Sequence, residues 1–237
     1  IKGNFMKPPY RPPEFLKPEN KVSLFARGTY TIVGSLDKVP SAVRERIAHE
    51  EKPLVVKQYT PEGLTMLFKG QGKTTQECAK ALKDRQAMTK RFFESVTRPG
   101  TIPESLFLIG GTSDDARVYE LQEKVAVSQD VMSLMAMKDP EAELSGAFSP
   151  AVISAIGREI KAFVERAREV FDEKTWQEFP ELDHRVFDMV SMNNLVIDRD
   201  GNLRMYDTNA LLPWSEEKPE VKEKYLSKLR DVLRICM

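Results

Sequence analysis

Cysteine is scarce in this chain, because Cys78 and Cys236 are its only thiols. Two cysteines are too few for a disulfide framework or a cysteine-rich zinc site, so we expect a protein of a reducing compartment such as the cytoplasm. Long apolar runs are also missing, since none approaches the roughly 20 residues of a membrane-spanning helix. No signal peptide is visible. The chain begins at Ile1, and the sequence leaves open whether residues precede it.

Net charge is absent as well. The chain has 36 Lys and Arg against 36 Asp and Glu, which gives a formal net charge of zero. No overall charge points to nucleic acid or to an anionic membrane surface as a partner, so we expect neither, and any binding surface should be local. What is present, 41% hydrophobic and 30% charged residues, is the composition of a globular protein with a sizeable core.

The residue pattern divides the chain into three regions. Residues 1–20 contain five prolines, which predicts an extended arm able to dock a protein partner. Residues 21–125 are predicted to form strands around one long helix, with strands within 22–36 and at 54–59, 106–109 and 117–121 and the helix at 74–95. Residues 126–237 are predicted to be mainly helical, with helices at 131–137 and 151–171 and a hairpin at 194–206. The predicted fold class is α+β.

Residues 187–207 arrange polar groups in an order that suits phosphoryl transfer. Asp188 and Asn193 lie five positions apart, and Asp207 follows two apolar runs joined by an Asp-Gly turn. Transfer from Mg-ATP needs a carboxylate that orients the acceptor hydroxyl, and an amide and a carboxylate that hold the metal ions. The spacing therefore predicts one half of a kinase active site, with Asp188 as catalytic residue and Asn193 and Asp207 as Mg²⁺ ligands. Asn194 is the alternative ligand.

Two segments in the first half extend this pattern. Residues 26–33, Ala-Arg-Gly-Thr-Tyr-Thr-Ile-Val, are similar to the glycine-rich loop G-x-G-x-x-G-x-V, with Ala26 and Thr31 in place of two glycines. Lys57, in Val-Val-Lys, is similar to the lysine of the V-A-I-K strand. From about residue 22 to 210 the chain thus resembles the protein kinases. The resemblance implies a bilobal fold, with a small β-rich N-lobe at 21–125 and a reduced, mainly helical C-lobe at 126–237.

The resemblance also implies an ATP site and a substrate. Lys57 would contact the phosphates and pair with a carboxylate of the long helix, for which Glu77 is the first candidate and Glu94 the alternative. Backbone groups around Glu123 and Val125 would bind adenine. The glycine-rich segment would add Ala26, Gly28, Tyr30 and Val33 to the nucleotide site. With ATP and Mg²⁺ bound, the expected acceptor is a Ser or Thr of a protein substrate, although a small-molecule hydroxyl fits the same residues.

Several departures from the family narrow the resemblance. Val186-Phe187 precedes Asp188 instead of His-Arg, and Thr208-Asn209 follows Asp207 instead of Phe-Gly. No Ala-Pro-Glu occurs in residues 208–237. The chain therefore resembles the shortened, atypical kinases of bacterial secreted effectors and phages, which lack a standard activation segment. A location in the cytoplasm, or in a host cytosol after secretion, would follow.

Four alternatives concern other functions or other motifs. The eroded glycine loop also fits a pseudokinase that acts as an interaction module, and the same fold with the same metal ligands could transfer AMP. Residues 70–75 contain Gly-Lys-Thr before a helix, as in a P-loop, although Leu67 occupies the first glycine position. Residues 198–201 resemble part of a calcium loop, but they lack its final Glu, and we interpret them as a β-turn.

Overall fold

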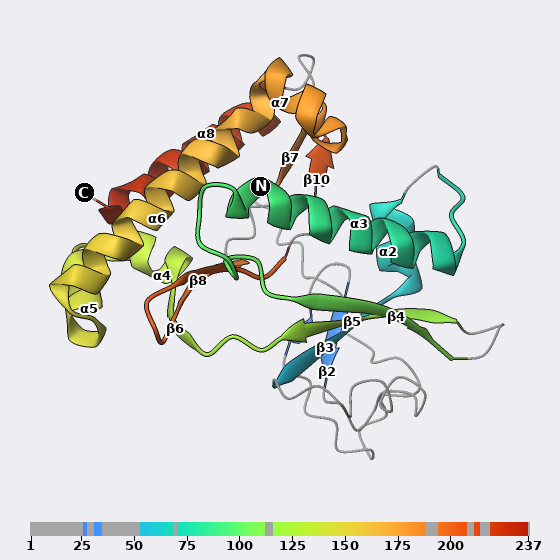
Figure 1. Cartoon of the computed structure of the whole chain (residues 1–237), viewed down its shortest axis with the longest axis horizontal. Helices are drawn as coiled ribbons and strands as arrows, with labels where there is room; N and C mark the ends of the chain where they lie inside the picture. Colours follow the sequence, from blue (N-terminus) through green and yellow to red (C-terminus); the bar gives the residue numbers. More distant parts are fainter. Residues whose placement is uncertain are drawn as a thin grey trace, which may run out of the picture.

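The computed structural model describes residues 26–27, 31–34, 53–68, 71–111, 116–187, 194–207, 211–213 and 219–236. The fold is α+β, as predicted. Figure 1 shows a sheet crossed on one face by helix α3 (Thr75–Glu94), and a group of helices in which α6 (Pro150–Arg168) and α8 (Pro219–Leu233) run side by side. No helix in the described ranges is both long enough and apolar enough to cross a membrane. The predicted arm at 1–20 lies outside these ranges.

The sheet of the first half is antiparallel, and its strand order is β1-β2-β3-β5-β4. Its strands are β1 (Ala26–Arg27), β2 (Thr31–Gly34), β3 (Leu54–Tyr59), β4 (Ser105–Gly110) and β5 (Arg117–Glu123). Lys57 of β3 pairs in register with Glu120 of β5. Since side chains alternate between the faces of a sheet, Lys57, Tyr59, Val118 and Glu120 share the face that α3 covers.

Helix α3 joins the two halves of the molecule. Its first turns place Cys78 and Leu82 against Tyr59 of the sheet, next to the short helix α2 (Pro61–Leu67). Its last turns place Phe92 and Phe93 in the larger core of the second half. The predicted helix at 74–95 is therefore confirmed, and its apolar residues serve two cores instead of one.

The second half is built around α6. Its residues Ile156, Ile160 and Phe163 are buried, and the predicted helix at 151–171 continues into the 3₁₀ turn at Glu169–Phe171. Tyr225 of α8 is buried against α6 and donates a hydrogen bond to the carbonyl of Ala167, at 3.1 Å. The other helices are α4 (Val131–Ala136), α5 (Pro140–Ala147) and α7 (Glu173–Glu178), with further 3₁₀ turns at Pro180–Leu182 and Arg234–Cys236.

Two small sheets complete this half. Strands β6 (Val127–Asp130), β8 (Leu195–Asp198) and β9 (Leu203–Met205) form one, in which β8 and β9 are the predicted hairpin. Strand β7 (Arg185–Phe187) pairs with β10 (Leu211–Pro213) to form the other. Because β7 leads into residue 188 and β10 follows residue 207, this pairing brings together the flanks of the predicted catalytic stretch.

Candidate functional site

Lys57 lies in the middle of β3, and its side chain is only 13% exposed. A mostly buried ammonium group is costly unless it is paired. Its Nζ donates a hydrogen bond to the carbonyl oxygen of Tyr206, at 3.2 Å, and lies 3.7 Å from the carboxylate of Glu120. The predicted strand lysine therefore points inward, toward the residue that precedes Asp207.

Glu120 is the carboxylate that pairs with Lys57, and it is fully buried on β5. Besides Lys57, it accepts hydrogen bonds from the hydroxyls of Tyr59 (3.0 Å) and Ser105 (2.8 Å) and from the amide of Gln122 (3.3 Å). These donors offset the cost of burying the charge, because each supplies a hydrogen bond that water would otherwise provide.

Asp207 follows a backbone segment held from two sides. The carbonyl of Tyr206 accepts hydrogen bonds from Gln122 (2.9 Å) and Lys57, and the N–H of Tyr206 donates to the carbonyl of Asn194 (2.8 Å). Strands β3 and β5 thus fix the chain just before Asp207, whose side chain is half-buried. Asn194, the first described residue after Asn193, therefore lies beside the backbone that precedes Asp207.

The other end of that loop is also anchored. Phe187, the residue before Asp188, is buried, and its ring centroid lies 4.8 Å from that of Phe93 and 5.5 Å from that of Phe92. Packing against α3 thus fixes the point at which the chain enters residue 188. Asp188 and Asn193 themselves lie outside the described residues, as do Gly28 and Tyr30.

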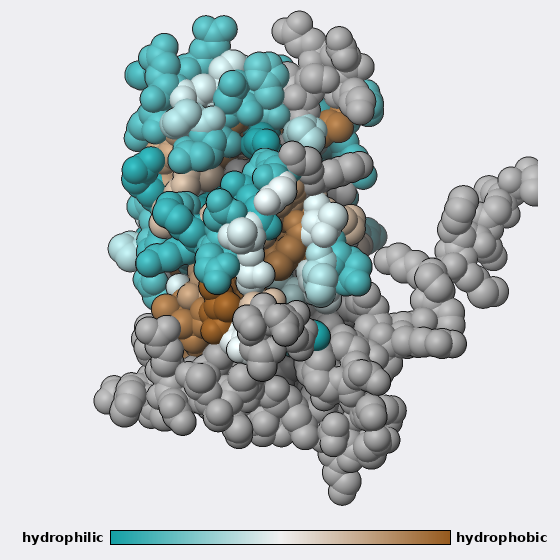
Figure 2. Space-filling model, turned by 90° about the vertical axis from the view of Figure 1, so that its right-hand side faces the viewer, coloured by the Kyte–Doolittle hydropathy of each residue, from teal (hydrophilic) through white to brown (hydrophobic). Residues whose placement is uncertain are grey.

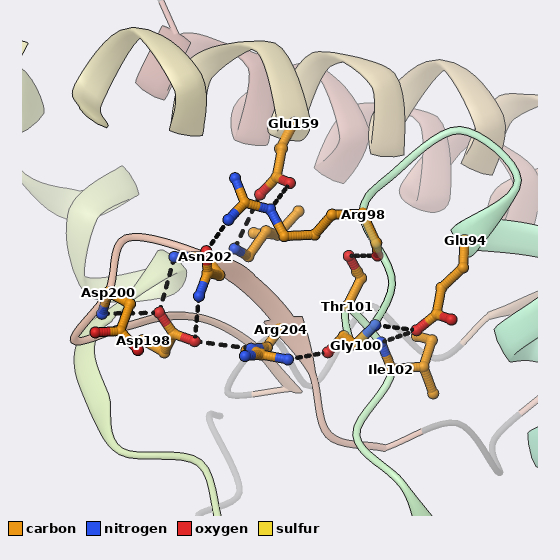
Figure 3. A network of polar contacts seen from close by, with 11 residues as sticks. Glu94, Arg98, Gly100, Thr101, Ile102, Glu159, Asp198, Asp200, Asn202 and Arg204 are labelled. Atoms are coloured by element: carbon orange, nitrogen blue, oxygen red, sulfur yellow. Dashed lines mark hydrogen bonds and ion pairs between the residues drawn. The ribbon is translucent and has the colours of Figure 1, made fainter. Parts of the chain in front are cut away.

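The hairpin that leads to Asp207 is closed by Asp198 (Figure 3). One carboxylate oxygen of Asp198 accepts hydrogen bonds from the N–H groups of Asp200 (3.0 Å) and Asn202 (2.8 Å). The other accepts from the side chains of Asn202 (2.9 Å) and Arg204 (2.8 Å). Burial raises the pKa of Asp198, but the hydrogen bonds from Asn202 and Arg204 outweigh it and hold the pKa below its usual value. The turn itself uses this carboxylate, so the interpretation as a β-turn is confirmed.

Further contacts connect this hairpin to α6 and to the loop that follows α3. Arg98, in the loop after α3, contacts Glu159 of α6 and Asn202 of the hairpin, and Arg204 donates to the carbonyl of Gly100 (Figure 3). These contacts fix the position of the hairpin, and with it the point at which the chain continues to Asp207.

The structure does not bring Glu77 to Lys57, and this corrects the predicted pair. Thr74 accepts a hydrogen bond from the N–H of Glu77 (3.3 Å), while the Glu77 carboxylate accepts from the N–H of Thr74 (2.7 Å). This capping box begins α3, and the hydrogen bonds from Thr74 lower the pKa of Glu77. The alternative, Glu94, instead accepts hydrogen bonds from the N–H groups of Gly100 (2.7 Å) and Ile102 (3.2 Å).

The other predicted ATP contacts are placed along the first sheet. Ala26 of β1 pairs with Val33 of β2, and Val33 pairs in turn with Lys57. Glu123 and Val125 are half-buried at the end of β5 and just beyond it. The N–H of Glu123 donates to the carbonyl of Glu104, at 2.9 Å.

Two cavities in the described part of the chain lie away from Lys57 and Asp207. One, of about 310 Å³, lies between α2, the start of α3 and the sheet; its lining includes Tyr59, Phe68, Lys73 and Cys78. Figure 2 views the molecule from the right-hand side of Figure 1, where α2 and the start of α3 lie, and shows apolar residues between polar ones. The other, of about 440 Å³, lies between α5, α6 and Ile235. Neither cavity is lined by Lys57, Glu120 or Asp207.

The P-loop alternative finds no support in this arrangement. A P-loop offers free N–H groups at a helix N-terminus to phosphate. Here the N–H groups of Thr74 and Glu77 at this helix start already donate to the side chains of Glu77 and Thr74.

The described residues contain no cluster of three His, Cys, Asp or Glu side chains suited to a metal ion. Of the two predicted Mg²⁺ ligands, Asp207 is described by the structure and Asn193 lies outside the described residues. An Asp-Asn pair with water could still satisfy Mg²⁺, which commonly keeps several water ligands.

Sequence reasoning missed Glu120 and Gln122. A signal was available, because these polar residues stand two positions apart in a strand whose other central residues are apolar. Such spacing places both on one face of the strand, and a charged residue there needs an opposite charge nearby.

No protein-family model matches the chain, and no curated protein matches it. Among solved structures, a chain of the CAK complex from Chaetomium thermophilum, bound to ATP-gamma-S, is similar with a TM-score of 0.38 and 14% identity. The match covers 81% of this chain and 47% of that chain, so this chain spans about half its length. A likeness this distant carries no argument about this chain.

Proposed function

We propose that this chain is an ATP-dependent phosphotransferase with a kinase-like active site. One observation carries the proposal: the mostly buried ammonium of Lys57 donates to the carbonyl of Tyr206, directly before Asp207. Lys57, on the first sheet, is thereby held beside the backbone that leads from β9 into Asp207. This combination suits a polyphosphate with a divalent cation, because the lysine neutralises phosphate oxygens and the carboxylate binds the metal.

The remaining roles follow from the resemblance. Asp188 would orient the acceptor hydroxyl and accept its proton as the hydroxyl oxygen bonds to the γ-phosphorus and ADP leaves. Asn193 and Asp207 would hold Mg²⁺, whose oxygen ligand preference fits an amide and a carboxylate. When bound, Mg²⁺ supplies neutralisation of phosphate charge. The buried Phe187 and the Asn194–Tyr206 hydrogen bond support this assignment, because they fix the residues immediately before Asp188 and after Asn193. The acceptor we propose is a protein Ser or Thr.

The test is intact-mass measurement after incubation with Mg-ATP and a generic acceptor protein such as casein. We expect a gain of one phosphoryl group on the chain or the acceptor. Asp188→Ala and Asp207→Ala should each slow this gain by about 100-fold or more. Asp200→Asn is the matched control, because Asp200 is exposed in the hairpin turn and only its backbone takes part in the turn. It should retain full activity.

Two results would redirect the proposal. Addition of an adenylyl group would assign the site to AMP transfer. Binding of Mg-ATP without any transfer, together with partner binding that survives Asp188→Ala and Asp207→Ala, would assign the chain to the pseudokinases.

A further inference from the structure

We infer that Glu120 is the positioning residue for Lys57, and that the phosphate-binding lysine of this chain is held within the sheet instead of by helix α3. The inference rests on the proposed function and identifies what orients its lysine.

The register of the sheet fixes the pair. Lys57 and Glu120 are directly opposite each other on adjacent antiparallel strands, so both side chains leave the same face. The ladder between β3 and β5 runs from Leu54 to Gln58, and Lys57 lies inside it. A carboxylate at this position stays beside the lysine for as long as the two strands remain paired.

The surroundings of Glu120 indicate a group held in one orientation. It is 0% exposed, and donors from three strands approach its carboxylate. Tyr59 of β3 donates to the oxygen that faces Lys57, while Ser105 of β4 and Gln122 of β5 donate to the other oxygen. Gln122 also donates to the carbonyl of Tyr206, the group that Lys57 contacts. Glu120, Lys57 and the backbone before Asp207 therefore form one connected polar cluster.

No acidic side chain of α3 is placed to take this role among the described contacts. Glu77 caps the start of the helix, and Glu94 binds backbone N–H groups of the loop after it. Asp84 pairs with Lys80 one turn away, at 2.6 Å. Among the described residues, Lys57 thus takes its charged partner from β5 and not from α3.

A double-mutant cycle tests the inference. The variants are Glu120→Gln, Lys57→Met and the double variant, with Mg-ATP turnover by the full chain as the measurement. If Glu120 acts through Lys57, Glu120→Gln should lower kcat/KM roughly 10- to 100-fold. In the Lys57→Met background it should cause no further loss, because the group that it positions is gone.

Glu77→Gln is the matched control, since it removes the same charge from the helix carboxylate first expected to pair with Lys57. It should change kcat/KM less than twofold. Glu120→Asp covers the case in which Glu120→Gln does not fold, as judged by circular dichroism. The shorter side chain keeps the charge but places it farther from Lys57. The decrease in kcat/KM that Glu120→Asp causes should also vanish in the Lys57→Met background.

The outcomes separate the inference from the proposed function. Additive effects in the cycle, or loss of activity in Glu77→Gln, would overturn the inference while the wild type remains an active enzyme. If the wild type binds Mg-ATP without turnover, the same cycle is measured as Kd, and additivity there overturns the inference. A wild type that neither binds nor turns over Mg-ATP would overturn the proposed function, and the inference with it.

Discussion

Asp198 and Glu120 are buried carboxylates that define local structure through the donors around them. Asp198 is satisfied mainly by its own turn and by Arg204, so its contacts are local in sequence. Glu120 is satisfied by three strands, so its contacts depend on the assembled sheet. A buried charge without such donors would cost several kcal/mol, and each carboxylate therefore favours one arrangement of its neighbours.

Asp198 should make the stability of the protein depend on acid pH. Its pKa in the folded protein is lowered, so its contribution is full above the pKa of the unfolded chain, about 3.9. That contribution is lost as the pH falls from there through the folded pKa. We expect Asp198→Asn to reduce the free energy of unfolding by about 2–4 kcal/mol near neutral pH, because Arg204 and Asn202 lose a charged acceptor.

The measurement is urea unfolding of the wild type and Asp198→Asn, near neutral pH and below about pH 3. The difference between the two proteins should shrink in acid. A difference that stays constant or grows as the pH falls would contradict the role given to the Asp198 charge.

At the scale of elements, the β8–β9 hairpin is packed closely against α6. Gly201 in its turn has φ of +77°, and a Cβ there would overlap Val152 of α6 and contact Ile156. Both the backbone conformation and the space favour glycine at this position. The hairpin that leads to Asp207 is thereby seated on the main core.

Gly201→Ala should destabilise the protein by about 1–3 kcal/mol, since it adds backbone strain and a clash with Val152. Gly146 in α5 is the matched control, because a Cβ there meets nothing within 4 Å. Gly146→Ala should instead stabilise by about 0.5–1 kcal/mol, as alanine is favoured over glycine in a helix. Urea unfolding measures both, and equal signs for the two substitutions would contradict the packing described here.

At the scale of the whole molecule, the two halves meet in two places. Helix α3 contributes to both cores, and the side chains of Lys57 and Gln122 reach from the first sheet to the backbone of Tyr206. A ligand held between Lys57 and Asp207 would contact both halves, so its binding should stabilise the complete fold.

Mg-ATP should therefore raise the melting temperature in a concentration-dependent way. At a concentration 100 times Kd the stabilisation is about 2.7 kcal/mol, which corresponds to a shift of several degrees. Asp207→Ala should lose the Mg²⁺-dependent part of the shift, whereas Asp200→Asn should keep it. The measurement is a thermal scan with ATP in the presence of Mg²⁺ or EDTA, and equal shifts under the two conditions would contradict a metal role for Asp207.

The sequence by itself determined the elements whose signal is local. Helix-favouring residues without Gly or Pro predicted α3, and helical spacing predicted α6. Two apolar runs joined by an Asp-Gly turn predicted the β8–β9 hairpin, and an apolar strand predicted that Lys57 lies on β3. Such patterns follow from side-chain period and turn chemistry, which depend only on neighbouring residues. The spacing of Asp188, Asn193 and Asp207 is likewise a local feature of the sequence. The roles of these three residues stay predictions.

Only the tertiary structure decided which groups meet. The sequence offered Glu77 and Glu94 as partners of Lys57, because both lie on the helix that follows it. The partner is Glu120, since pairing of β3 with β5 sets a register that no local pattern encodes. Glu77 instead completes a capping box, because it stands three residues after Thr74. Contacts between residues distant in the chain arise from packing and strand pairing, so the assembled fold decided the geometry of the site.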